Sequence, residues 1–305
     1  MKTNSSTIKH ILSFDVEEYF DVELAARAGI DAHTHYPRRV RLAMDFILNT
    51  LAERNANATF FVLGRLAEKE NQLIKEIAGA GHELACHSMN HIMITKMTPQ
   101  SFRNDLLKAK KSLEDIIGKP IIGYRAPTFS IVKNTTWALD EIINVGFKYD
   151  SSIYPVRHNL YGLPEAPTAI HYAITPAGNS ILELPVMTRR IFTLNVPVGG
   201  GGYFRLLPLS IITSSIKKYQ QHNHHAVLYF HPWEFDPEQP VLPMPTLSRL
   251  RHRIGLRKTR KKLNALLKQF EFTSVSAIID TLKNTDITCD YETFKKSVNI
   301  NSKNG

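Results

Sequence analysis

The chain has 305 residues, of which 43% are hydrophobic and 22% are charged, so it can bury a core and is not disordered over most of its length. Its formal net charge is +10, but eight of its 38 basic residues, and no acidic residue, lie between Arg249 and Lys262. The remaining 30 basic residues are balanced by 28 acidic ones, a net of +2, which excludes a basic surface over the whole molecule.

Cysteine content and hydropathy exclude several further classes of protein. The two cysteines, Cys86 and Cys289, cannot form a disulfide framework, a Cys-rich zinc module or a Cys-x-x-Cys redox pair. Residues 1–20 contain no secretory signal pattern, and no apolar run approaches the ~20 residues of a transmembrane helix. We therefore expect a cytoplasmic protein.

Short apolar runs typical of strands alternate with segments of helical period along most of the chain. In chain order, this pattern predicts strand 11–14, helix 40–51, strand 59–63, helix 66–77, strand 83–86, helix 99–116, strand 121–124, helix 135–143, strands 147–149 and 182–186, helix 209–219 and strand 226–230. Thr98 and Pro99 indicate a capped helix start. The glycine run 199–202 and the proline-rich stretch 232–245 are expected to be loops.

Strands that alternate with helices predict an α/β protein with a parallel sheet. The number of such units favours a closed or nearly closed (β/α) barrel over an open sheet. We expect one main domain over residues 8–235, a C-terminal extension over 236–290 that packs on the barrel, and a frayed tail over 291–305.

Polar side chains follow five of the predicted strands at the point where each strand ends. They are Asp15 to Glu18, His87 to His91, Arg125, Asp150 and His231. Because the carboxyl ends of parallel barrel strands converge on one face, we expect these side chains to lie close together.

The four-residue spacing of His87 and His91 places both imidazoles on the same side of a helical turn. Together with a carboxylate they would form a two-histidine, one-carboxylate metal site, which leaves positions on a divalent ion open to water and substrate. Such a pair also arises by chance in a chain with 13 histidines, so the nearby acids Asp15 and Glu17 carry much of the argument.

Asp15 and Glu17 are one residue apart and suit different tasks, one binding the ion and the other acting as a base. The alternative is that these acids cap the next helix. Arg125 could orient the base, and Asp150 and His231 resemble an orienting carboxylate and a general acid, although each is also compatible with a purely structural role.

The ordered set Asp15-x-Glu17, His87-Ser-x-x-His91, Arg125-x-Pro127, Asp150-Ser-Ser152 and Val227-Leu-x-x-His231 resembles the five motifs of the polysaccharide deacetylase family (NodB-homology domain, carbohydrate esterase family 4). The stretches 14–20, 123–127, 149–152, 199–205 and 230–234 further resemble the deacetylases of exopolysaccharide and exosortase loci, which have a C-terminal extension. The resemblance implies a distorted (β/α) barrel that holds one divalent ion, usually zinc, and removes N-acetyl groups from amino sugars.

Carried over to this chain, the resemblance assigns a role to each motif residue. The base is Asp15, oriented by Arg125; the metal ligands are Glu17, His87 and His91; the acid is His231, tuned by Asp150. The family's consecutive Asp-Asp is replaced here by Asp15-Val-Glu17, so the third ligand is Glu17 or, alternatively, Glu18.

Substrate contacts are expected from residues around these motifs. They are the backbone N–H of Thr128 as an oxyanion donor, Tyr154 in the acetyl pocket where many family members have Trp, His158 in the groove, and Trp233.

The leading hypothesis is therefore an N-deacetylase that acts on an exopolysaccharide or its precursor. The alternatives are a C–N hydrolase of a small amide and a non-catalytic carbohydrate-binding protein. Nucleic-acid binding is not expected, because no aromatic residues are interleaved with the basic ones.

The basic segment 249–262 has leucines at helical spacing and predicts an amphipathic helix that packs on the barrel. Its positive face is either a simple solvated surface or a contact to anionic lipid head groups or to a diphosphate-linked glycan at the inner membrane surface.

Overall fold

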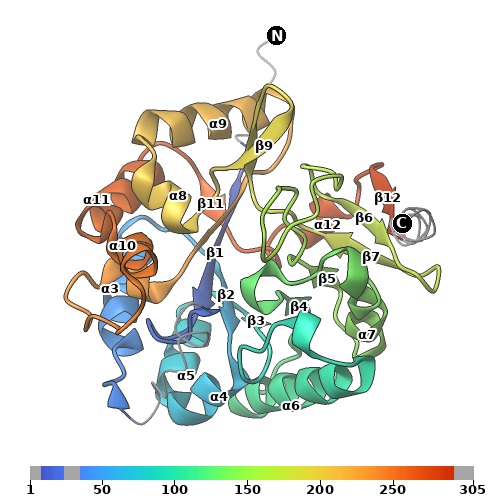
Figure 1. Ribbon diagram of the computed structural model, residues 1–305, viewed down its shortest axis with the longest axis horizontal. Coiled ribbons are helices and arrows are strands. Elements are labelled where there is room, and N and C mark those ends of the chain that lie inside the picture. The colour runs from blue at the N-terminus through green and yellow to red at the C-terminus, as the bar shows by residue number, and fades with distance from the viewer. Residues whose placement is uncertain (1–7, 24–34, 292–305) are drawn as a thin grey trace.

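The structure, a computed structural model, describes residues 8–23 and 35–291, and it consists of a mostly parallel β-sheet surrounded by helices (Figure 1). The main sheet has ten strands, and two further strands form a separate antiparallel pair. The α/β class predicted from the sequence is confirmed.

The strands of the main sheet are β1 (His10–Val16), β2 (Thr59–Val62), β3 (Glu83–Cys86), β4 (Gly123–Tyr124), β5 (Tyr149–Asp150), β6 (His171–Ile174), β7 (Ser180–Glu183), β10 (Val227–Phe230), β11 (Phe272–Thr273) and β12 (Thr288–Asp290). The separate pair is β8 (Thr188–Ile191) with β9 (Leu194–Pro197).

The helices are α3 (Val40–Glu53), α4 (Gly64–Lys69), α5 (Asn71–Gly79), α6 (Pro99–Ile117), α7 (Ala138–Asn144), α8 (Gly201–Leu206), α9 (Leu209–Gln221), α10 (Thr246–Arg253), α11 (Leu256–Leu267) and α12 (Ile279–Leu282). A 3₁₀ turn over Pro232–Phe235 follows β10.

The strand order in the main sheet is β10-β1-β2-β3-β4-β5-β7-β6-β12, and β11 also pairs with β1. All of these pairs are parallel except β6 with β7. No strand pairing joins β10 to β7 within the described residues, but the chain after β7 reaches β10, where the Met187 N–H donates to the Val227 carbonyl at 2.9 Å. The sheet therefore curves back on itself through single hydrogen bonds rather than through a continuous ladder.

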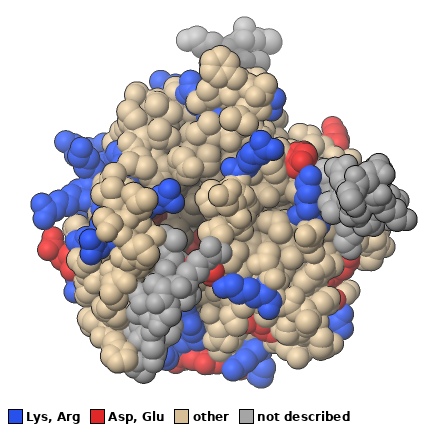
Figure 2. All heavy atoms as spheres, viewed as in Figure 1, with Lys and Arg blue, Asp and Glu red and all other residues tan. Residues whose placement is uncertain are grey.

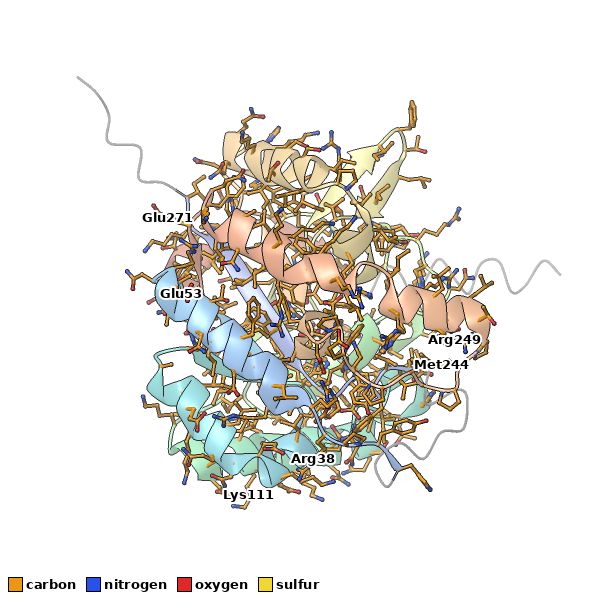
Figure 3. All side chains as sticks on the ribbon, turned by 90° about the vertical axis from the view of Figure 1, so that its left-hand side faces the viewer. Arg38, Glu53, Lys111, Met244, Arg249 and Glu271 are labelled. Atoms are coloured by element: carbon orange, nitrogen blue, oxygen red, sulfur yellow. The ribbon has the colours of Figure 1, made fainter. Side chains whose placement is uncertain are left out.

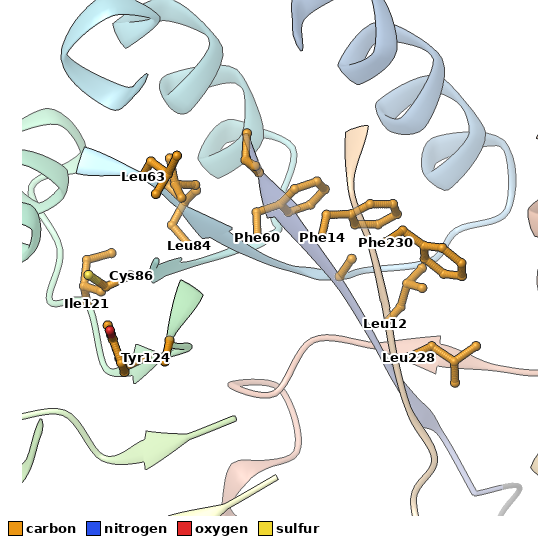
Figure 4. Packing of buried hydrophobic residues seen from close by; sticks show 14 of the residues in the cluster. Leu12, Phe14, Phe60, Leu63, Leu84, Cys86, Ile121, Tyr124, Leu228 and Phe230 are labelled. Atoms are coloured by element: carbon orange, nitrogen blue, oxygen red, sulfur yellow. The ribbon is translucent and has the colours of Figure 1, made fainter. Parts of the chain in front are cut away.

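The core lies between the sheet and the helices. Phe14, Phe60 and Phe230 come from three neighbouring strands and lie side by side beneath the helices (Figure 4). The Phe14 and Phe60 rings are stacked with centroids 5.0 Å apart. This packing fixes the register of β1 against its neighbours, and with it the direction of the acids that follow β1.

Helix boundaries largely follow the sequence signals. The Thr98 hydroxyl accepts the Ser101 N–H at 3.2 Å, and Gly118 ends α6 with a φ of 65°. The predicted helix 66–77 is two helices, since Glu70 has φ −117° and ψ 41° and breaks the run. The glycine run was expected to be a loop, but its second half opens α8.

Tight packing explains the first half of the glycine run. A Cβ at Gly200 would lie 1.9 Å from the Tyr229 carbonyl oxygen, and one at Gly199 would lie 2.9 Å from that of Met187. These glycines let the chain before α8 lie close to Met187, beyond the end of β7, and to Tyr229 of β10.

The basic segment 249–262 forms two helices, not the single one predicted. Its leucines pack as expected, with Leu256, Leu263 and Leu266 of α11 buried. Residues after it supply β11 and β12 to the main sheet. The expected tail lies outside the described residues apart from Tyr291, which is buried.

Both cysteines are free thiols: Cys86 is buried and Cys289 is half-buried. No helix within the described residues is long and apolar enough to span a membrane. The cytoplasmic location stays a prediction.

Candidate active site

Polar residues in the last part of β1 and directly after β1, β3, β4 and β10 meet at the carboxyl ends of these strands. Asp15, Glu17, His87 and Arg125 are all nearly inaccessible to solvent. Parallel pairing of β1 with β2 and β10, and of β3 with β2 and β4, sets these strand ends side by side.

Three of these side chains form a cluster that could hold a metal ion. Glu17, His87 and His91 each offer one ligand atom, and these atoms lie within 4.8 Å of one another. His87 Nδ1 lies 2.8 Å from the Arg125 carbonyl, so Nδ1–H donates there and Nε2 is left as the ligand. Glu17 Oε2 is 2.8 Å from His91 Nε2 but accepts no well-aligned hydrogen bond.

This cluster fits a divalent ion such as zinc. Burial would raise the pKa of Glu17, but the charges of His91 and His231 hold it well below its ordinary value, so Glu17 is a carboxylate. Burial lowers the pKa of His87 to about 4, which leaves the imidazole neutral as a ligand must be. A buried carboxylate oxygen without a hydrogen bond, beside two imidazoles, suits an ion that completes its bonding.

The two histidines do not share a helical turn, contrary to the sequence-based expectation. They lie in a loop in which Ser88 and His91 adopt positive φ values of 73° and 58°. Asp105 of α6 holds this loop, because its carboxylate accepts the Ser88 hydroxyl at 2.7 Å and the Met89 N–H at 2.9 Å. A tertiary contact from α6, and not helical periodicity, therefore sets the spacing of the ligands.

Glu18, the alternative third ligand, is engaged elsewhere. Its carboxylate accepts the backbone N–H groups of Arg39 and Val40 at 2.9 to 3.1 Å, which caps the start of α3. Burial raises the pKa of Glu18 to about 7. Of the two acids, only Glu17 belongs to the cluster.

Asp15 is paired with a fully buried arginine. Arg125 Nη1 donates to Asp15 Oδ1 at 2.6 Å and to the Ser13 hydroxyl at 2.9 Å. Arg125 Nε and Nη2 donate to Ser151, and the guanidinium lies 4.0 Å from the centre of the Phe61 ring. These contacts fix the direction of the Asp15 carboxylate.

His231 is held by Glu234, not by Asp150. Glu234 Oε2 accepts the His231 backbone N–H at 3.0 Å and lies 3.3 Å from His231 Nδ1. The other Glu234 oxygen accepts Arg205 Nε at 2.7 Å, in a pair that is almost entirely buried. Burial lowers the pKa of His231, but the negative charges of Glu17 and Glu234 more than offset this and raise it to about 9.

The prediction that Asp150 tunes His231 is corrected by these contacts. Asp150 is fully buried, accepts the Ser152 hydroxyl, and pairs in register with Glu183 of β7. Burial raises the pKa of both carboxyls. None of the hydrogen bonds or ion pairs within 8–23 and 35–291 joins Asp150 to His231.

Trp233 lies between two histidines. Its ring stacks on His231 with centroids 5.1 Å apart and on His252 of α10 with centroids 4.6 Å apart. Its indole N–H donates to Glu17 Oε1 at 3.2 Å. Trp233 thus contacts both the proposed ligand and the proposed acid, and its contact to substrate stays a prediction.

Three further residues were predicted to contact substrate. Thr128 has a φ of 55°, and its N–H donates to none of the described residues, so it is free to donate elsewhere. Tyr154 is buried against Phe129 and Tyr229. His158 is exposed and stacks on Tyr161 with centroids 3.9 Å apart.

Sequence reasoning missed the Glu234–Arg205 pair and the acid Glu183. Glu234 had a signal, because an acid three residues after a strand-ending residue is typical of a capping box at the next turn. Arg205 and Glu183 had none, since their roles depend on segments distant in sequence.

Comparisons with known proteins bear on this site. The family model described as polysaccharide deacetylase matches residues 41–148, and a model described as a domain of unknown function, DUF3473, matches residues 151–280. The second match crosses residue 235, the predicted boundary of the extension.

Two curated relatives are similar to parts of the chain. A peptidoglycan-N-acetylglucosamine deacetylase of Bacillus cereus is 27% identical over 184 residues, which cover 56% of this chain and 64% of the relative. A peptidoglycan deacetylase of Helicobacter pylori is 31% identical over 107 residues, covering 35% of this chain and 36% of the relative. The matches thus span less than two thirds of the relatives' own length.

Among solved structures, a provisionally assigned polysaccharide deacetylase from Mycobacterium smegmatis superposes with a TM-score of 0.59. It is 20% identical, and the match covers 92% of this chain and 93% of that one. This likeness supports the fold over nearly the whole chain.

Proposed function

We propose that this chain, whose family model and relatives support membership of the polysaccharide deacetylase family, is a metal-dependent N-deacetylase of a glycan. One observation carries the proposal: a cluster suited to a divalent ion, Glu17 with His87 and His91, lies between an arginine-bound aspartate and a carboxylate-bound histidine. This arrangement supplies a base, a site for a Lewis acid and an acid in one place.

In this proposal each group has one task. A zinc ion, held by Glu17, His87 and His91, would polarise the acetamide carbonyl when bound. Asp15, directed by Arg125, takes the proton of the attacking water. His231, charged and held by Glu234, gives a proton to the departing amine, so that the C–N bond breaks and acetate leaves. The free N–H of Thr128 is the proposed donor to the carbonyl oxygen as negative charge develops on it.

The glycan in this proposal is an exopolysaccharide or its precursor. The support is the resemblance of the segments around Arg205 and His231 to deacetylases of exopolysaccharide loci. Residues 236–290 belong to the same catalytic unit in this proposal, because the end of α10 and the residue after it hold Arg205 through the His252 and Ile254 carbonyls, each at 2.8 Å.

Acetate release from N-acetylated chitooligosaccharides tests the activity. The purified chain should release acetate, lose this activity with a chelator and regain it with zinc. Asp15→Asn and His231→Ala should be inactive while zinc remains bound. Acetate release from small amides but not from glycans would favour the C–N hydrolase alternative, and zinc binding with no hydrolysis of either would favour a binding protein.

A further inference from the structure

The helix α10 exposes apolar side chains instead of burying them. Leu247 is 71% exposed and Leu250 is 57% exposed, and the preceding Val241 is 53% exposed. The two leucines are three residues apart and so share one face of the helix. Within α10 itself, His252 is the one residue that is fully buried.

Uncompensated positive charge surrounds these leucines. Arg249, Arg251, Arg257 and Lys258 are exposed, and no described carboxylate lies within salt-bridge distance of them. The sequence has no acidic residue between Glu238 and Glu271. Elsewhere some exposed lysines are paired, as Lys111 is with Asp115 at 2.7 Å.

A cavity of about 360 Å³ opens beside the first turn of α11. Its lining includes the cationic residues Arg253, Arg257 and Lys258 together with Gly255. The first N–H groups of a helix have no carbonyl partner within the helix, and a cationic cavity at such a position suits the phosphate of a head group.

This surface lies at the rim of the candidate active site. In Figure 3, Arg249 and Met244 lie on the opposite side of the molecule from Glu271, which immediately precedes β11 and so marks the amino ends of the parallel strands. Figure 2 shows Lys and Arg side chains along the left-hand edge of the face that is turned towards the viewer. This face is hollowed near its middle. His252 of α10 stacks on Trp233, which stacks in turn on His231.

We propose that α10 and the first turn of α11 form a docking surface for an anionic phospholipid bilayer. The surface consists of Val241, Leu247, Leu250, Arg249, Arg251, Arg257 and Lys258. Apolar side chains that enter the acyl boundary, flanked by cations at head-group level, are typical of helices that lie in a membrane interface. A soluble anion would be bound by the cations alone and gives no reason for the two exposed leucines. The proposal does not depend on the hydrolase activity.

Co-sedimentation of the full chain with lipid vesicles tests this proposal. Vesicles of phosphatidylcholine with a third of phosphatidylglycerol should bind the chain, whereas vesicles of phosphatidylcholine alone should not. Changing Arg249, Arg251, Arg257 and Lys258 together to Gln should lower the partition coefficient at least ~100-fold, since each cation near an anionic surface contributes about 1 kcal/mol. Leu247→Ser with Leu250→Ser should lower it at least ~10-fold, through lost apolar burial.

Matched control variants lie on other faces of the molecule. Lys108, Lys148, Lys217 and Lys218 are also exposed and are changed together to Gln, and Leu42→Ser with Leu107→Ser changes two leucines that are 55% and 50% exposed. Neither control should alter vesicle binding.

Two results would overturn the proposal. The first is vesicle binding that the controls weaken as much as the test variants do, or no binding at all. The second is binding that inorganic pyrophosphate displaces and the leucine variant leaves intact, which would indicate a soluble phosphate ligand. All substituted side chains are exposed, so the variants are expected to fold, and their melting temperatures check this.

Discussion

Glu234 connects the proposed acid to the rest of the molecule. It lies between Arg205 and His231 and is fully buried, and it contacts both through separate oxygens at 2.7 Å and 3.3 Å. Glu234→Gln keeps the size of the side chain and removes its charge. The amide cannot both accept from Arg205 and stabilise a charged imidazole, so the variant isolates the positioning role of the carboxylate.

The expected changes in kcat and in the free energy of unfolding follow from these contacts. A hydrogen bond to a charged group contributes about 1.5 to 3 kcal/mol, so losing the one to His231 should lower kcat by about 10- to 100-fold. KM should change little, because Glu234 is buried behind His231. The free energy of unfolding should fall by about 3 kcal/mol, because Arg205 loses its counter-charge in a buried position.

The assay is acetate release from a chitooligosaccharide, with bound zinc and melting temperature measured on each variant. Asp150→Asn is the matched comparison, because it neutralises a second buried acid that does not contact His231. Its kcat should fall much less than that of Glu234→Gln. If Glu234→Gln fails to fold, Glu234→Asp keeps the charge but withdraws the carboxylate from Nδ1, and kcat should still fall.

The opposite order of the two variants' kcat values would refute this reasoning. A folded, zinc-loaded Glu234→Gln variant with normal kcat, beside an impaired Asp150→Asn variant, would restore Asp150 as the partner of His231.

Further predictions concern the ligands, the packing and pH. His87→Ala should lose bound zinc together with acetate release, whereas Glu18→Gln should keep zinc and lose about 1 kcal/mol of stability, because Glu18 caps α3; metal analysis and thermal unfolding separate the two. Gly200→Ala should cost more than about 3 kcal/mol in urea unfolding, because its Cβ would meet a backbone oxygen of β10, whereas Gly79→Ala has open space and should be neutral or stabilising. Burial lowers the pKa of His171 from 6.5 to about 4, so the stability that this residue contributes above pH 6.5 is lost as the pH falls towards 4. Between pH 7 and pH 5 the free energy of unfolding of the unchanged chain should fall by about 2 kcal/mol more than that of the His171→Gln variant. An equal fall in both would contradict this assignment.

Much of the architecture could be predicted from local signals. The strands around residues 11–14, 59–63 and 83–86 were predicted within two residues, because each is a short, mostly apolar run that ends at a polar or glycine residue. The start of α6 at Pro99 followed from its N-cap. The strands β6, β8, β9, β11 and β12 were missed, since their sequences are short and partly polar and become strands only by pairing.

The candidate site likewise has a part that could be predicted from the sequence and a part that could not. Asp15, Glu17, His87, His91, Arg125 and His231 could be named from the sequence because polar residues at the carboxyl ends of parallel strands must converge. The sequence could not show which acid pairs with which residue, because the partner of a carboxylate depends on distance and direction between segments far apart in the chain.

The sequence by itself determined the α/β class, the strand ends that meet and the set of residues able to form a metal site with a base and an acid. Only the tertiary structure decided that Glu18 caps a helix while Glu17 faces the histidines, that Glu234 and not Asp150 holds His231, and that α10 both binds Arg205 and exposes two leucines. The physical reason is that composition and periodicity fix which face of an element is buried, whereas pairing between charged groups is fixed by the packing of elements distant in sequence.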